Sequence, residues 1–476
     1  MQDPATPQIR RGFQAPVEPA APPAAPKLSR RRTAILGGAV LAVVAITTAI
    51  GAVVTHEPAQ TAAQVISDVS RPVQTVTTAA PATAITTRAQ IDSPGGRAEE
   101  TLNKAAAALL KGDQAGWLAM VDPGKPKVRA YYRQLYTSLR GLDVTALQFH
   151  RLIPKPVGWG DSSWTEDFFL TYCFSANSCP PFRYLNPGGP GAPMIAQGLT
   201  IRQVAALDYR ITAVGAPRLA SESWASPPWQ VTPLVQAKGK RVTVSAGRGD
   251  AKRIKEVLAA AERAATRADH YAGLVGNPQT RYRVYMATDK QWRTWFGGSQ
   301  GRWAIGYATF PQGVMTEIII RMSAAGSGSK LQNLLQHEMG HAVTVGGADL
   351  GGQAIANPMM WLQEGIAEYI AYAPRPATAT SRLPEVRDAL RRKRPSSIVL
   401  GQLSDNAGRN EASAYYGLSH FAVDCLADKY GERKLFDFVT LTLRERVGVD
   451  KASAQVFGTE FRPIDQTCRT WIRQRA

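Results

Sequence analysis

Apolar residues have helical spacing in four long stretches of this chain. Residues 97–120 form the first, with Ala and Leu as strong helix formers between the apolar positions. Residues 249–273 form the second, and 329–345 and 357–373 form two more, close together in the last third of the sequence. Each stretch is long enough for three or more helical turns, so we expect helices there.

Shorter strand-like runs lie between these predicted helices. Turn-rich sequence separates the runs at 144–153, 167–174 and 199–212, and two more runs lie at 280–288 and 313–323. The sequence therefore predicts an α+β fold in two units, an accessory domain at 97–238 and a second domain at 239–476. The order of elements in the accessory domain loosely resembles the cone-shaped folds of the NTF2-like or cystatin-like kind.

One further segment predicts a membrane anchor. Residues 33–55 contain no charged side chain, and 23 residues in a helix span a hydrocarbon core of about 30 Å. A cleaved signal peptide is the alternative, but the 32 residues before the span favour an uncleaved anchor. Because Arg30, Arg31 and Arg32 precede the span, we expect a single-pass type II protein of the cell membrane, with its N-terminus in the cytoplasm.

The regions on either side of this span are poor in large apolar residues. Residues 1–32 are rich in Pro and Ala before the three arginines, which predicts a disordered cytoplasmic tail. Residues 56–96 are rich in Thr, Ala and Pro, which predicts a flexible stalk.

All four cysteines lie after the predicted anchor. The most local of the three possible pairings joins Cys173 to Cys179 and Cys425 to Cys468, and neither spacing is that of a zinc knuckle. An oxidising compartment favours these disulfides over the alternative of four unpaired buried thiols.

The net charge of +19 favours anionic neighbours. The basic residues are scattered, and no nucleic-acid-binding motif or array of stacking aromatics accompanies them, so we do not expect a nucleic-acid partner. Anionic cell-surface polymer is a further candidate partner, either as an attachment site for the protein or as the target of an adhesion module.

The stretch "LLQHEMGHAV" at 334–343 carries the first candidate chemistry. His337 and His341 are four residues apart, so a helix places them on one face, where both can bind one metal ion. Neutral imidazole suits Zn²⁺, and Glu338 is placed to reach a zinc-bound water without ligating the metal. Ser329 with Gln332 predicts a capping box at the start of this helix.

The next predicted helix, "NPMMWLQEGIAEYIAYAP", offers carboxylates. Asn357 and Pro358 predict its start and Pro374 its end. Glu364 and Glu368 share one face of it, and two carboxylates on a largely apolar helix are costly to bury unless a cation is near.

The two motifs together resemble those of the gluzincin metallopeptidases, in which a glutamate from the following helix completes the HExxH site. The likeness covers the C-terminal half and is closest to the peptidase MA-like group, whose second motif has the form WLxEGxAEY. The matching residues here are Trp361, Leu362, Glu364, Gly365, Ala367, Glu368 and Tyr369. The resemblance implies one zinc ion held by His337, His341 and Glu364, with Glu338 as general base. It also implies that Glu368 holds a histidine ligand, His337 being the expected one; a solvated surface position is the alternative for Glu368.

A donor for the oxyanion of the tetrahedral intermediate is expected on the helix near 410–430. In the related peptidases a motif like "YxxS…F" precedes "YG" and "KL", and the positions that match it here are Tyr416, Ser419, Phe421, Tyr430, Gly431, Lys434 and Leu435. Tyr416 is the first candidate donor and His420 the second, against packing of the tyrosines in the core.

The substrate is expected beside a strand near the zinc. In the gluzincin fold an edge strand pairs with the extended peptide, and residues 304–308 are the candidate, with Gly306 allowing close approach of the backbone. The sequence thus predicts a membrane-anchored zinc metallopeptidase acting on a peptide or protein substrate, endopeptidase and aminopeptidase both being open. A catalytically silent binding or scaffold protein with the peptidase fold is the alternative, and the intact Glu338 disfavours it.

Overall fold

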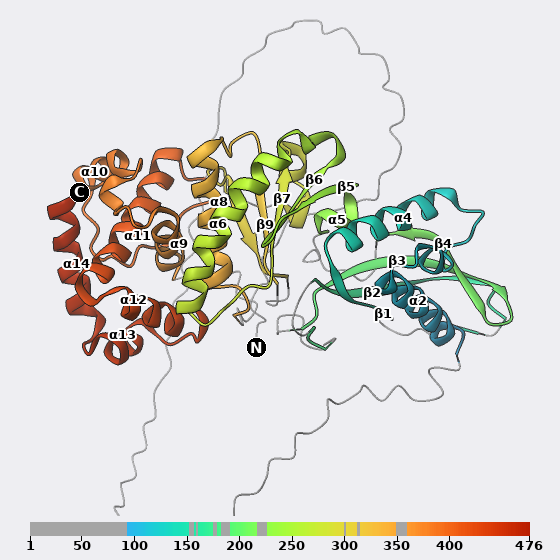
Figure 1. Ribbon diagram of the computed structural model, residues 1–476. Helices are drawn as coiled ribbons and strands as arrows, with labels where there is room; N and C mark the ends of the chain where they lie inside the picture. Colours follow the sequence, from blue (N-terminus) through green and yellow to red (C-terminus); the bar gives the residue numbers. More distant parts are fainter. Residues whose placement is uncertain are drawn as a thin grey trace, which may run out of the picture. The chain divides into compact units, whose positions relative to one another are not determined.

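The computed structural model describes residues 93–151, 157–158, 160–174, 179–181, 191–216, 226–298, 301–311, 315–348 and 359–476. Within these ranges the protein combines helices with two β-sheets, which confirms the α+β fold class (Figure 1). The predicted tail, the candidate membrane helix at 33–55 and nearly all of the predicted stalk lie outside the described residues. None of the helices from residue 93 onward is both long and apolar enough to cross a bilayer.

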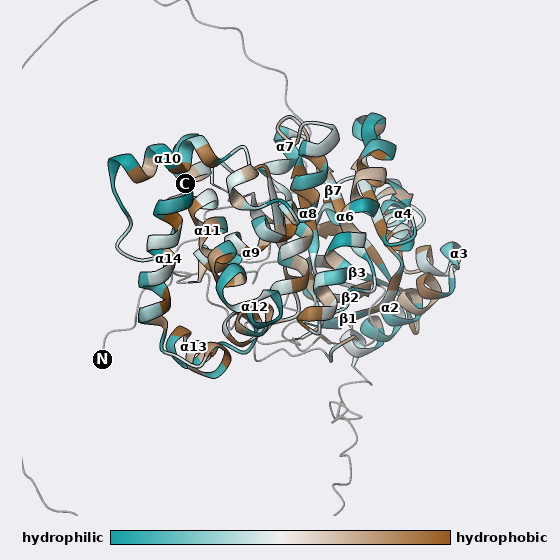
Figure 2. Ribbon diagram, turned by 60° about the vertical axis from the view of Figure 1, so that its left-hand side comes forward, coloured by the Kyte–Doolittle hydropathy of each residue, from teal (hydrophilic) through white to brown (hydrophobic). Residues whose placement is uncertain are grey.

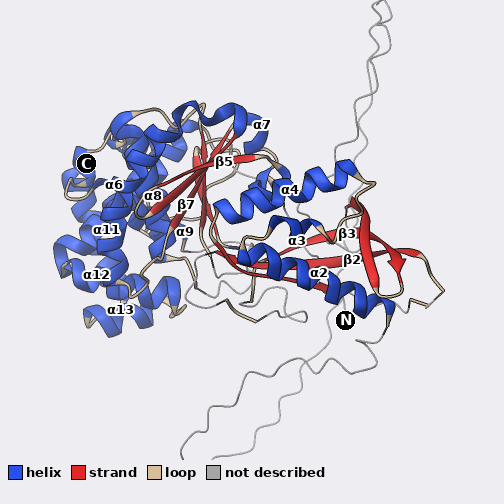
Figure 3. Ribbon diagram, turned by 45° about the vertical axis from the view of Figure 1, so that its right-hand side comes forward, coloured by secondary structure: helices blue, strands red, loops and turns tan. Residues whose placement is uncertain are grey.

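Three helices precede a four-stranded sheet in the first half of the described chain. The helices are α2 (Pro94–Lys111), α3 (Gln114–Leu118) and α4 (Pro126–Gly141). The strands are β1 (Val144–Arg151), β2 (Ser163–Phe174), β3 (Met194–Ala205) and β4 (Asp208–Gly215), and each pairs antiparallel with the next in the order β1-β2-β3-β4. Figure 3 shows α2 lying along this sheet.

Several boundaries in this half differ from those predicted. The first helix begins at Pro94, because the Ser93 side chain accepts a hydrogen bond from the Gly96 backbone at 3.1 Å, so residues 94–96 do not belong to a stalk. The stretch 97–120 is interrupted after Lys111, where Asp113 caps the short helix α3. The run 199–212 is not one strand: β3 ends at Ala205 and the chain turns back into β4.

The second sheet has five strands in the order β5-β6-β7-β9-β8. Its central strands β6 (Val242–Gly247), β7 (Tyr282–Ala287) and β9 (Glu317–Arg321) are parallel, while β5 (Leu234–Lys238) and β8 (Gly306–Thr309) are antiparallel edges. The predicted boundary after residue 238 falls between two paired strands of this sheet, since β5 belongs to it.

The two faces of this sheet are covered by different parts of the chain. Val284 and Met286 of β7 pack in one core with the alanines of α6 (Ile254–Leu274) and with α8 (Gly328–Thr344). Tyr285 and Ala287, which alternate with them, pack in a second core together with residues of α2, α4 and the first sheet. This period of two is that of a strand buried on both sides.

Two short helices, α5 (Pro228–Val231) and α7 (Asp289–Trp292), precede β5 and follow β7 in the chain. Further α-helices follow in the C-terminal part of the chain. They are α9 (Met360–Tyr372), α10 (Leu383–Arg392), α11 (Arg409–Tyr430), α12 (Glu432–Val439), α13 (Val449–Phe457) and α14 (Phe461–Arg475). Figure 2 shows hydrophilic and hydrophobic residues alternating along α10 and α14, in keeping with one buried and one exposed side on each.

Both predicted disulfides are present. Cys173 at the end of β2 is bonded to Cys179, and Cys425 of α11 is bonded to Cys468 of α14. The second bond fixes the last helix of the chain against the helix that carries Tyr416.

Candidate metal centre

Helix α8 places the two histidines of the HExxH motif side by side, as the spacing predicts. The Nε2 atoms of His337 and His341 are 3.1 Å apart, and the rings meet nearly edge to face. The helix cap is Ser327, two residues before the predicted cap, and Gln332 accepts a hydrogen bond from Arg263 of α6 instead of closing a capping box. This contact fastens α8 to α6 near its N-terminus.

Helix α9 brings a carboxylate to the same point. Glu364 Oε2 lies 3.2 Å from Nε2 of His337 and 3.4 Å from Nε2 of His341. These three residues form a group that could hold a metal ion. The candidate cap residues Asn357 and Pro358 lie outside the described residues, and α9 ends at Tyr372, just before Pro374 as predicted.

Close helix packing sets the position of Glu364. Next to it in the chain, Gly365 faces α11, and a β-carbon built there would lie 2.4 Å from the carbonyl oxygen of Ser419. Only glycine fits at this contact without moving a backbone. The glycine of the second motif therefore allows α9 to approach α11 closely.

Glu368 and Arg382 form a buried layer behind the histidines. Glu368 is only 2 % exposed, and its Oε1 lies 3.0 Å from Nδ1 of His337. The Arg382 guanidinium donates to the same carboxylate, from Nε to Oε2 at 2.6 Å and from Nη2 to Oε1 at 3.0 Å. A proton on Nδ1 of His337, on the side of Glu368, would leave the lone pair of Nε2 toward His341 and Glu364, which is the tautomer that a metal ligand needs.

The charges of these groups are strongly coupled. Burial opposes a positive charge on His337, but hydrogen bonds to Glu364 and Glu368 outweigh it and raise the pKa of His337 to about 10. Burial would raise the pKa of Glu364, but His341 and His337 lower it to about 2. The site therefore stabilises positive charge between its carboxylates, as a cation site must.

Glu338 is held at the edge of this group. It is 3 % exposed, burial raises its pKa, and its Oε2 has no hydrogen-bond partner among the described residues. Gly306 of the edge strand β8 lies against its other oxygen, since a β-carbon built on Gly306 would be 2.4 Å from Glu338 Oε1. Within the described chain Glu338 is thus an unengaged buried carboxyl group beside two histidines.

The structure places Tyr416, but not His420, next to the histidines. The centroid of the Tyr416 ring lies 5.7 Å from that of the His337 ring and 5.0 Å from Cζ of Arg382. His420 is buried one turn further along α11, with Asp424 Oδ1 at 3.4 Å and the ring of Tyr372 at 5.9 Å. Of the two candidate donors, Tyr416 is the one whose ring lies beside a candidate metal ligand.

Two residues near the site were not found from the sequence. Arg382 comes 14 positions after Glu368 and belongs to no spacing motif; the only signal for it was that a buried Glu368 needs a partner. Trp303 lies 5.6 Å from the Tyr416 ring, and its Nε1 donates to the carbonyl oxygen of Ser404. Both residues contact Tyr416 from elements distant in sequence.

No protein-family model matches the chain, and no curated protein sequence matches it. The interpretation of the site therefore depends on its geometry. Two imidazoles and a carboxylate that converge, with a second buried carboxyl group beside them, are suited to binding a metal ion and accepting a proton from a group bound to it.

Proposed function

We propose that this protein is a zinc-dependent metallopeptidase of the gluzincin type. The observation that carries the proposal is the spacing of the three candidate ligand atoms, 3.1 to 3.4 Å apart in every pair. A tetrahedral zinc ion with bonds of about 2.0–2.1 Å to nitrogen and oxygen requires ligand atoms about 3.3 Å apart. His337, His341 and Glu364 would hold the ion, which leaves a fourth position open.

Zinc bound there would lower the pKa of a water molecule and polarise a substrate carbonyl group. The residues of this chain supply the proton chemistry. Glu338 accepts the proton of the attacking water, since it is a buried carboxyl group on the same helix turn as the two histidines and its Oε2 has no hydrogen-bond partner among the described residues. It then donates that proton to the nitrogen of the leaving amine.

Tyr416 is proposed as the hydrogen-bond donor to the negatively charged oxygen that develops on the substrate. Burial, aided by the negative charge of Glu364, raises the pKa of Tyr416 well above its usual value. Its hydroxyl therefore keeps its proton at neutral pH and can donate it in a hydrogen bond.

The edge strand β8 is proposed as the substrate-binding strand. Among the described strands it pairs with β9 alone, and its first residue, Gly306, contacts Glu338. A peptide in extended conformation that adds to the free edge would bring a backbone carbonyl group next to the general base. Peptide or protein chains are therefore the proposed substrate class.

The proposed location is the outer face of a cell membrane, with residues 33–55 as a type II anchor. Two disulfides among the described residues support an oxidising compartment for the part of the chain that carries the site. Protease added to intact cells should then digest epitopes after residue 56 and spare one within residues 1–28. A mature chain that starts after residue 50 in the medium would disprove the anchor.

The function is tested by metal analysis of the purified full-length chain together with cleavage of a peptide library. We expect one zinc per chain and cleavage by the wild type, and zinc without cleavage for Glu338→Gln. Stoichiometric zinc with no cleavage by either protein would instead support a silent scaffold protein. A chain that binds no zinc would contradict the metallopeptidase and would also leave the silent scaffold protein without support.

A further inference from the structure

A pocket open to solvent lies beside α11, and none of the residues that line it is assigned to the metal centre. It is formed by α10, the segment after it, α11 and α14. The residues that line it are apolar apart from one serine and three arginines, and the apolar ones are Leu390, Pro395, Ile398, Leu400, Leu418 and Ile472. The three arginines are Arg394, Arg469 and Arg473.

The walls of this pocket are fixed to one another. Cys468, directly before Arg469, is bonded to Cys425 of α11, so α14 and α11 are covalently joined beside the pocket. Asp465 of α14 accepts hydrogen bonds from the Ser397 hydroxyl at 2.8 Å and from the Ile398 backbone at 2.6 Å. A pocket held in this way needs little ordering when it binds a ligand.

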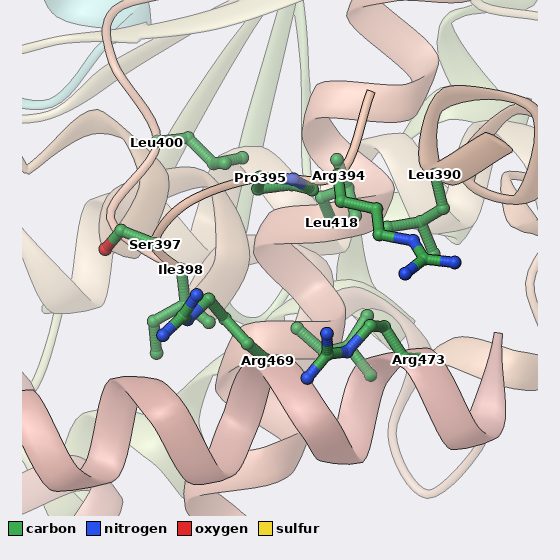
Figure 4. A pocket seen from close by; sticks show the side chains of 10 residues that line it. Leu390, Arg394, Pro395, Ser397, Ile398, Leu400, Leu418, Arg469 and Arg473 are labelled. Carbon is green, nitrogen blue, oxygen red and sulfur yellow. The ribbon is translucent and has the colours of Figure 1, made fainter. Parts of the chain in front are cut away.

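The arginines give the pocket a positive mouth. Figure 4 shows Arg469 and Arg473 coming from one helix and Arg394 from the segment on the opposite side. Arg469 pairs with Asp465 at 3.0 Å, and Arg473 donates to the Thr470 hydroxyl. No carboxylate among the described residues pairs with Arg394 or Arg473, so two guanidinium groups are available to an anion.

Several other hydrogen-bonding groups around the pocket are already engaged. The Ser397 hydroxyl donates to Asp465 and accepts from the Val399 backbone, Pro395 has no N–H, and the Ile398 N–H is bonded to Asp465. These groups cannot serve the amide groups of a peptide, and amide groups buried without partners are costly, whereas an alkyl chain has none to satisfy.

We propose that this pocket binds an amphiphile with one alkyl chain and an anionic head, the chain against the apolar wall and the head on Arg394 and Arg473. A fatty carboxylate and an alkyl phosphate share this chemistry. Binding would need neither the metal ion nor Glu338, so the proposal holds or fails separately from the peptidase activity.

The test uses the full-length chain in nanodiscs of neutral lipid and a photoreactive probe, octanoic acid with a diazirine in its chain. Labelled peptides are mapped for the wild type, for Arg394→Gln/Arg473→Gln, and for the control Arg391→Gln/Arg392→Gln. The control removes the same charge from two exposed arginines that pair with Asp388 and do not line the pocket. Thermal melting of all three proteins checks their folding.

We expect labelling within residues 390–400 and 469–473, with a half-saturating probe concentration about tenfold higher in the Arg394→Gln/Arg473→Gln variant and unchanged in the control. Octanoate, octyl phosphate or both should compete with the probe, and octanol should not. The relative strength of the first two identifies the preferred head group.

Three results would overturn the proposal. Equal labelling of both double variants would show that the arginines do not bind the head group. Competition by octanol as strong as that by octanoate would show a merely apolar site. Displacement of the probe by a peptide ending in leucine at lower concentration than octanoate would make a peptide terminus the ligand.

Discussion

Arg382 binds both carboxylate oxygens of Glu368, at 2.6 and 3.0 Å. Since Glu368 in turn lies 3.0 Å from Nδ1 of His337, a continuous series of charge-assisted contacts joins the start of α10 to the candidate metal ligands. The same guanidinium lies over the ring of Tyr416. One residue thus positions a candidate ligand and the candidate oxyanion donor together.

Replacing Arg382 by alanine should weaken both zinc binding and peptide cleavage. Glu368 would be left buried without its cation, so it would hold His337 less firmly, and we expect zinc affinity or kcat/KM to fall by about 10- to 100-fold. Chelator competition and peptide cleavage measure the two effects. Arg382→Lys should recover part of the loss, and Arg391→Ala, an exposed change on the same helix, should have no effect.

The three glutamates near the histidines should be separable by their metal content. Glu364→Ala removes one of three protein ligands and should abolish tight zinc binding, whereas Glu338→Gln should keep zinc and lose turnover. Glu368→Ala should fall between them, with a loss of about 10- to 100-fold. Zinc content and cleavage of one peptide, measured on all three variants, give the order. Normal zinc and activity in Glu364→Ala would contradict the ligand set.

Gly306→Ala should affect the general base but not the metal. The added methyl group would lie 2.4 Å from Glu338 Oε1, so the carboxyl group must move. Misplacement of a catalytic group by about 1 Å can cost about 100-fold in rate, and we expect kcat to fall by that order while zinc stays bound. Gly273→Ala on α6 is the matched control, because a β-carbon there meets nothing within 4 Å.

Glu317 should make the stability of the protein depend on pH. It is fully buried on β9, and burial, against the opposing charge of Arg283, raises its pKa from 4.5 to about 7. Between these values the folded protein keeps a proton that the unfolded chain releases, so the free energy of unfolding should fall as pH rises from about 4.5 to 7. Above that pH range Glu317 causes no further change in the free energy of unfolding.

Glu317→Gln removes this titrating group and should make the free energy of unfolding less dependent on pH. We expect the variant to melt a few degrees above the wild type at pH 8 and to show no such gain at pH 4.5, which thermal melts across this range would measure. The exposed change Glu445→Gln should leave the pH dependence as it is in the wild type. The same slope in wild type and Glu317→Gln would show that Glu317 is ionised throughout.

The sequence alone predicted the α+β class, both disulfides and the convergence of His337, His341 and Glu364. The pair of histidines depends on local spacing, since residues four apart share a helix face. The convergence of Glu364 with them was implied by the resemblance of the two motifs to those of the gluzincins. The disulfides followed from choosing the most local of the three possible pairings. The start of α8 was placed two residues late, because Gln332 bonds to Arg263 on another helix and not to its own cap. A cap motif cannot reveal that competing partner.

Features that depend on distant parts of the chain were not predicted. Arg382 reaches Glu368 only because α10 packs on α11, and no periodicity in the sequence encodes that contact. Strands β5 and β6 were missed as well, and with them the fact that the second sheet begins before residue 239. The contact between Arg382 and Glu368 and the place of β5 in the second sheet both depend on tertiary packing.

Strand β5 belongs to the second sheet, and the first half of the chain covers one face of that sheet. These two features determine whether the protein can be cut into separate folded parts. A gene fragment that encodes only residues 239–476 would lose an edge strand and uncover a sheet face that carries Arg283, Tyr285 and Ile319. We expect such a fragment to aggregate when it is secreted alone. The two halves should for the same reason be inherited together, and a relative with the HExxH half alone should carry more polar residues at the positions of Tyr285 and Ile319.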